Sequence, residues 1–188
     1  MLPKIATPKY DMIVPSTGKS ITYRPYVVKE EKILLIAMET DDNITIENAI
    51  QNLIKACVET AIDINKLTSF DVEFMFVTLR AKSVGEGIEL SPNCTSCEET
   101  NEVKVDLDKV TVKNLEDQTD TMIKLTNDIS VELKWPTMKH RHIDLVDEAS
   151  ETETMINMMA STIGTIYSGE EIYSTADVPK KEVKEFVE

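Results

Sequence analysis

Several features that define large protein classes are missing or scarce in this sequence. Its 188 residues include only three cysteines, too few to build a secreted framework of disulfide bonds. No apolar run reaches the length of a membrane span, and the opening residues MLPKIATPKY lack the apolar segment of a secretory signal. We therefore expect a soluble protein made in a reducing cytosol, with no membrane partner.

Positive charge is also in short supply. The chain has 20 Lys and Arg residues against 34 Asp and Glu residues, which gives a formal net charge of −14. A field of this sign repels phosphates and argues against nucleic acid as the main partner. The length suits a single domain spanning residues 1–188, long enough to bury about two-thirds of the surface of its unfolded chain.

The common catalytic and cofactor-binding motifs are absent. The chain has no G-x-S-x-G, H-E-x-x-H, Walker or dinucleotide-binding fingerprint, and most of its carboxylates are expected on solvated faces. Cys57 falls on the apolar face of a predicted helix, and both histidines lie more than eighty positions downstream. We interpret it as a small core residue and not as a nucleophile. No catalytic, cofactor-binding or metal-ligating residue is assigned, and we expect no enzyme activity.

The hydrophobic pattern predicts an α+β fold with a helical core and β-hairpins at the N-terminus and in the middle of the chain. Four regions follow one another: an N-terminal hairpin (10–24), a helical core (29–82), a β-hairpin region (84–135) and C-terminal helices (137–188). In the first hairpin, Gly18 can supply the positive φ that its turn needs.

Three helices are predicted in the core. The apolar block Ile33–Met38 follows a charged entry and is typical of a buried helix, although a strand is not excluded by periodicity alone. The second helix carries apolar residues at helical spacing from Ile46 to Ala61. The third begins near Thr68, with Asp71 as a plausible capping partner, and is apolar on nearly all sides. We expect this third helix at the centre of the core.

Alternating apolar residues then predict hairpins, followed by helices. Residues 84–90 and 103–107 make one hairpin, residues 110–112 are strand-like, and residues 122–125 and 129–133 make a second hairpin. Met155, Met159, Ile163 and Ile166 mark a long amphipathic helix that ends near Gly169. A short extended piece at 171–173 and a last helix after Pro179 complete the chain.

Cys94 and Cys97 lie at the far end of the first of these hairpins. Two thiolates at this spacing form half of a zinc-ribbon knuckle, but a structural site needs four ligands and the chain has no second C-x-x-C. A subunit interface could supply a second pair, although no sequence feature indicates one. The alternative is a turn that keeps two reduced thiols. A thioredoxin-like redox pair fits less well, since the motif does not open a helix.

Lys139-His-Arg-His142 is the only local basic cluster. Two histidines two residues apart suit ligands on one side of a strand, but solvent-facing residues on a loop or helix start are commoner. We favour the solvent-facing interpretation. The methionines at 155, 158 and 159 suit either an adaptable contact surface or core packing.

Several stretches taken together resemble the baseplate hub assembly family of T4-like contractile-tailed bacteriophages. They are LPKIATPKYDMIVPSTGKSITYRPYVVKEEKILLIAMET, FDVEFMFVTLRAKSVGEGIEL, the cysteine pair with VKVDLDKVTV, IKLTNDISVELKWP and IYSGEEIYSTADVPKKEVKEFVE. Their order spans almost the whole chain. The resemblance implies a non-enzymatic role in building the baseplate hub and contributes no catalytic residues.

Two versions of that role stay open: a chaperone that shields hub subunits in the host cytoplasm, or a component retained in the tail baseplate. The expected partners are hub proteins, with the oligomeric state open. The alternative from a different class is a zinc-ribbon-like interaction module unrelated to phage tails. We place the contact surface near the Gly85–Thr100 hairpin and the Lys139–His142 segment, which are polar projections from apolar elements.

Overall fold

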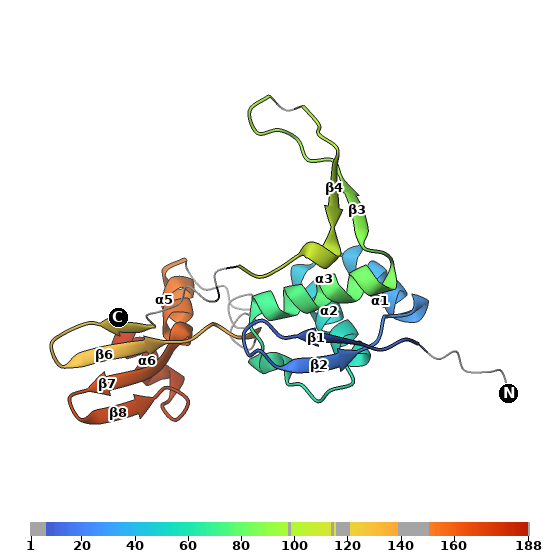
Figure 1. Ribbon diagram of the computed structural model, residues 1–188. Coiled ribbons are helices and arrows are strands. Elements are labelled where there is room, and N and C mark those ends of the chain that lie inside the picture. Colours follow the sequence, from blue (N-terminus) through green and yellow to red (C-terminus); the bar gives the residue numbers. More distant parts are fainter. Residues whose placement is uncertain (1–6, 98, 114, 116–120, 139–150, 188) are drawn as a thin grey trace. The chain divides into compact units, whose positions relative to one another are not determined.

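The structure is a computed structural model that describes residues 7–97, 99–113, 115, 121–138 and 151–187. The chain divides into two compact units. Unit 1 comprises Met1–Ile64 and Phe70–Lys113, and unit 2 comprises Asn65–Ser69 and Asn114–Glu188. The single domain expected across residues 1–188 stays a prediction. Mixed helices and antiparallel sheets confirm the α+β class (Figure 1).

Unit 1 opens with the predicted N-terminal hairpin. Strands β1 (Tyr10–Ile13) and β2 (Ser20–Tyr23) pair antiparallel. The turn between them is closed by the Gly18 N–H, which donates to the Val14 carbonyl over 2.8 Å. Gly18 has a φ of +65°, which an L-residue adopts only with strain, so the expected role of this glycine is confirmed. The side chains that this hairpin buries are Met12, Val14, Ile21 and Tyr23.

Three helices follow in unit 1: α1 (Val28–Met38), α2 (Asn43–Cys57) and α3 (Ser69–Ser83). The Asp42 side chain caps α2 by accepting the N–H groups of Ile44 and Thr45. On α3, Met75 and Leu79 are completely buried, which confirms the prediction that α3 is central to the core of this unit. Leu34 and Ala37 of α1 pack with Ala49 of α2, and Phe76 of α3 contacts the same cluster.

A two-stranded hairpin extends away from these helices (Figure 1). It consists of β3 (Gly87–Leu90) and β4 (Val103–Asp106), as predicted, with Cys94 and Cys97 in the loop between them. A short 3-10 helix, η2 (Leu107–Lys109), follows β4. Residues 110–112 form no strand, so that prediction was wrong; they leave η2 as irregular chain.

Unit 2 contains a four-stranded antiparallel sheet in the order β5-β6-β7-β8. Its elements are β5 (Met122–Lys124), β6 (Ile129–Leu133), α5 (Glu151–Thr162), β7 (Ile163–Ser168), β8 (Glu171–Ser174) and α6 (Lys180–Val187). A short 3-10 helix, η1 (Ile64–Lys66), lies at the boundary of the units in sequence. Helices α5 and α6 pack against each other. None of the described helices is long and apolar enough to cross a membrane.

The long helix predicted from Met155 to Ile166 ends earlier than expected. It stops at Thr162, and Ile163–Ser168 forms the inner strand β7, paired on both edges. The prediction was therefore wrong for Ile163 and Ile166. The residues from Thr162 to Tyr167 are rich in β-branched side chains, which suit a strand between two others better than a helix.

Candidate interaction surfaces

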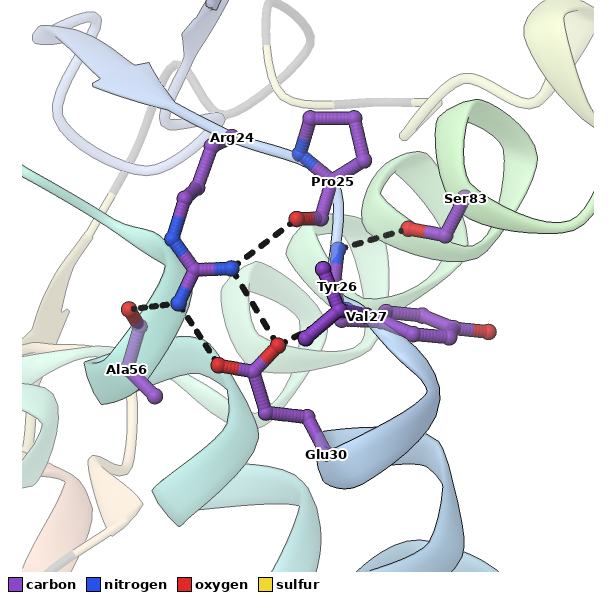
Figure 2. Close-up of polar contacts among 7 residues, drawn as sticks. All are labelled: Arg24, Pro25, Tyr26, Val27, Glu30, Ala56 and Ser83. Carbon is purple, nitrogen blue, oxygen red and sulfur yellow. Dashed lines mark hydrogen bonds and ion pairs between the residues drawn. The ribbon is translucent and has the colours of Figure 1, made fainter. Parts of the chain in front are cut away.

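Helix α1 is held at its N-terminus by a salt bridge within unit 1 (Figure 2). The Arg24 guanidinium contacts both carboxylate oxygens of Glu30, at 2.6 and 3.2 Å. It also donates to the carbonyl of Pro25 over 3.0 Å and to that of Ala56, at the end of α2, over 3.1 Å. Arg24 therefore joins the segment before α1, the first turn of α1 and the last turn of α2.

The Glu30 carboxylate has a second function, because it also caps α1. Its Oε2 accepts the Val27 N–H over 2.8 Å, which satisfies one of the backbone donors that a helix start leaves unpaired. Val27 has no side-chain acceptor, so only this half of a capping box is made. The hydrogen bond from Arg24 lowers the pKa of Glu30, and the bond to Glu30 raises the pKa of Arg24.

The segment before α1 is fixed on its other side by α3. The Tyr26 N–H donates to the Ser83 hydroxyl over 2.9 Å, and that hydroxyl donates to the Leu79 carbonyl over 2.6 Å. Tyr26 itself is buried. Thus α2 and α3 both set the position at which α1 begins.

Most of the apolar side chains of α1 face outward. Leu34 and Ala37 are buried, whereas the helix period places Val28, Leu35 and Ile36 on the opposite side. We define the α1 surface as the exposed apolar residues of this helix, which are Val28, Ile33, Leu35, Ile36 and Met38. The helix predicted in this region is confirmed, but the prediction that it is buried holds for only one of its faces.

The β3–β4 hairpin carries a second apolar surface. Ile88 pairs with Val105 and Leu90 with Val103, and these four side chains share one face because alternate residues of a strand point the same way. Glu89 and Lys104 form a 2.8 Å ion pair between the strands. Leu90 and Val103 are exposed, while Ile88 and Val105 are half-buried. An isolated two-stranded hairpin is only marginally stable in water, so this one needs support.

That support comes at the base of the hairpin. The Lys82 ammonium, at the end of α3, lies 2.7 Å from the Glu86 carboxylate and 2.6 Å from that of Asp108 in η2. The Leu107 N–H donates to the Glu86 carbonyl over 2.8 Å. Bonding to these two carboxylates raises the pKa of Lys82, Asp108 contributing most. These contacts join the end of α3 to the residue before β3 and to η2, which follows β4.

The residues singled out from the sequence do not assemble into one site. Cys57 is completely buried at the end of α2, as expected for a core residue, and burial raises the pKa of its thiol to about 11. Cys94 and Cys97 lie in the hairpin loop and are not joined in a disulfide. The predicted contact segment Lys139–His142 lies outside the described residues. Asp71 is buried on α3 and accepts two hydrogen bonds from Ser16.

The exposed α1 surface is the feature that sequence reasoning missed. A signal for it existed, since the six residues from Ile33 to Met38 are all apolar and therefore cover every side of the helix. Such a pattern predicts burial without specifying whether the same chain or another one supplies the covering atoms.

A comparison with known protein families decides the class of this protein. The family model described as "T4 bacteriophage base plate protein" matches residues 7–188. The chain belongs to this family. The resemblance to T4-like phage baseplate proteins is thus confirmed, and an interaction module unrelated to phage tails is not favoured. No curated protein and no solved structure matches the chain. For a phage baseplate protein, exposed apolar surfaces suggest contacts with other baseplate proteins.

Proposed function

We propose that this baseplate protein assists assembly of the baseplate hub without catalysing a reaction. The observation that carries the proposal is the α1 surface, five apolar side chains left exposed on a helix whose sequence pattern predicts burial. Large apolar side chains left exposed together on one helix mark a candidate binding site for other proteins.

The anchoring of α1 supports a role in binding. Arg24 and Glu30 fix the start of the helix, and Leu34 and Ala37 fix its inner face. A partner therefore meets a preformed surface, and little conformational freedom is lost when the two associate. The uncovered side chains of the β3–β4 hairpin, Leu90 and Val103, supply a second contact in the same unit.

The charge of the protein suits a steering role. With a net charge of −14, the protein attracts basic surfaces of a partner at long range, while the apolar contacts hold the complex once it has formed. Hub proteins in the host cytoplasm are the partners that we propose, with the chain acting either as a chaperone or as a subunit that stays in the hub.

The proposed partners are tested by purifying the full chain from infected cells during tail assembly. Mass spectrometry should identify phage hub proteins in the eluate, at a fixed ratio to the chain. Recovery of the chain without any hub protein contradicts the proposal.

The composition of the mature virion distinguishes the chaperone from the resident hub subunit. A resident hub subunit should be detected by mass spectrometry in purified virions at a constant number of copies per tail. A chaperone should be present in assembling tails and absent from finished ones. Absence from purified virions therefore removes the resident version.

A further inference from the structure

The loop that joins β3 to β4 is held in a defined shape by backbone contacts. Asn93 and Thr100 form an isolated β-bridge, and their side chains are joined by a 2.9 Å hydrogen bond. Inside this bridge, the Cys94 N–H donates to the Glu99 carbonyl over 2.8 Å. The strands of the hairpin thus continue toward the loop, and the two cysteines follow in a tight turn.

The turn directs hydrogen-bond donors toward the sulfur of Cys94. The backbone N–H groups of Ser96 and Cys97 donate to this sulfur, and the Cys97 thiol does so as well. The Cys97 thiol thus lies within hydrogen-bonding reach of the Cys94 sulfur, so one metal ion can contact both sulfur atoms.

We propose that Cys94 and Cys97 bind one zinc ion as two thiolate ligands, and that another polypeptide chain completes its coordination. Binding forms two sulfur–zinc bonds and releases the thiol protons to solvent. Zinc is the ion that suits paired thiolates on a turn, in a tetrahedral arrangement of four ligands.

The remaining ligands are assigned to another chain because of what surrounds the pair. Among the residues that the structure describes, no group of three or more His, Cys, Asp and Glu side chains could hold a metal ion. The third cysteine, Cys57, is completely buried in the core of unit 1. Cys97 is exposed in the loop between β3 and β4, where a ligand from a second chain can reach it. A shared ion would therefore join this hairpin to its partner.

The full chain tests this proposal when it is purified with its affinity tag removed, equilibrated with zinc chloride and then desalted. Zinc per chain is measured by elemental analysis, and mass in solution by light scattering. The same measurements are made after co-expression with the other baseplate proteins of the phage. Cobalt replaces zinc in a parallel sample, because its visible absorption reports tetrahedral thiolate ligation.

Two results support the proposal and identify the source of the missing ligands. One zinc per two chains in a dimer shows that a second copy supplies them. One zinc per complex, found only after co-expression, shows that a baseplate partner does. In either case Cys94→Ser should remove the zinc and the association, while Cys57→Ala should keep both. Circular dichroism verifies that each variant is folded.

Three results overturn the proposal. The first is the absence of zinc both from the chain purified alone and from the co-expressed sample, whether the two thiols are free or joined in a disulfide. The second is one zinc per monomer, which places all the ligands in this chain. The third is zinc that persists in the Cys94→Ser, Cys97→Ser double variant. Each of them leaves the proposed function standing, because the α1 surface does not depend on the metal.

Discussion

The Arg24–Glu30 salt bridge should account for a measurable part of the stability of unit 1. Replacing Glu30 by Gln keeps the size of the side chain but removes its charge and places an amide opposite the guanidinium. The two side chains are only 24% and 15% exposed, so solvent screens their interaction little. Hydrogen bonds to charged groups contribute about 1.5–3 kcal/mol, and breaking a fully buried pair costs about 3–5 kcal/mol. For this partly buried pair we expect a loss of about 2–3 kcal/mol.

Hydrogen exchange is the appropriate assay, because it reports on α1 directly. The single tryptophan, Trp135, lies in unit 2 and would not follow the unfolding of unit 1 by fluorescence. A loss of 2–3 kcal/mol corresponds to exchange of the amides of residues 28–38 that is about 30- to 150-fold faster. Glu31→Gln is the matched control, since it removes a charge from the next residue and leaves the Arg24 contacts in place.

The stability lost when Glu30 is replaced by Gln should decrease as the pH falls. The hydrogen bond from Arg24 lowers the pKa of Glu30 in the folded protein. The charged form therefore stabilises the fold fully above the unfolded glutamate pKa of about 4.3, and this contribution declines as the pH falls toward the folded value. The difference in amide exchange rate between the wild type and Glu30→Gln should shrink over the same pH range. Equal exchange in the two proteins at neutral pH, or a gap that grows on acidification, would refute the reasoning.

Two further predictions concern Cys57 and Gly164. Cys57 should resist alkylation at pH 8 in the folded, metal-free protein while Cys94 reacts, because burial raises the pKa of Cys57 to about 11. Mass spectrometry of the labelled peptides measures the reaction of both thiols. Equal labelling of the two would contradict the account. Gly164→Ala should destabilise unit 2 by about 1 kcal/mol in chemical denaturation, since its Cβ would lie 3.2 Å from the Glu132 carbonyl oxygen. Gly87→Ala, with no neighbour within 4 Å, is the control and should be close to neutral.

Local patterns were sufficient to predict both hairpins of unit 1 and its three helices. The β3–β4 hairpin followed from alternating apolar residues around a polar loop, and its register pairs Ile88 with Val105 as one face. Each of these elements is specified by residues close together in the sequence, so its pattern can be recognised in a single sequence.

The end of α5 was not predictable in the same way. Met155, Met159, Ile163 and Ile166 fit the helical period, but the last two belong to β7. Pairing with β6 and β8 decides this, and it depends on residues up to about forty positions away. Gly164 gives a local hint, since it lies at a bulge where β6 and β7 change register.

The exposure of α1 lies beyond sequence reasoning for a different reason. An apolar pattern reports that a side chain is normally removed from water, and it is silent about which chain covers it. Leu34 and Ala37 are covered by unit 1, whereas Leu35 and Ile36 are not. The same limit applies to Cys94 and Cys97, whose spacing indicates a turn but identifies no further ligands.

The central claim is that the α1 surface binds baseplate proteins, and the Leu35→Ala, Ile36→Ala double variant tests it most directly. These side chains are 54% and 52% exposed. Burying a whole side chain of this size gives about 1.5–3 kcal/mol, so covering the exposed half of both contributes about 2 kcal/mol. We therefore expect the Kd for the co-purified hub protein to rise about 30-fold. Ile13→Ala, at a side chain that is 63% exposed on β1, should leave it unchanged. A double variant that binds with the wild-type Kd would contradict the claim.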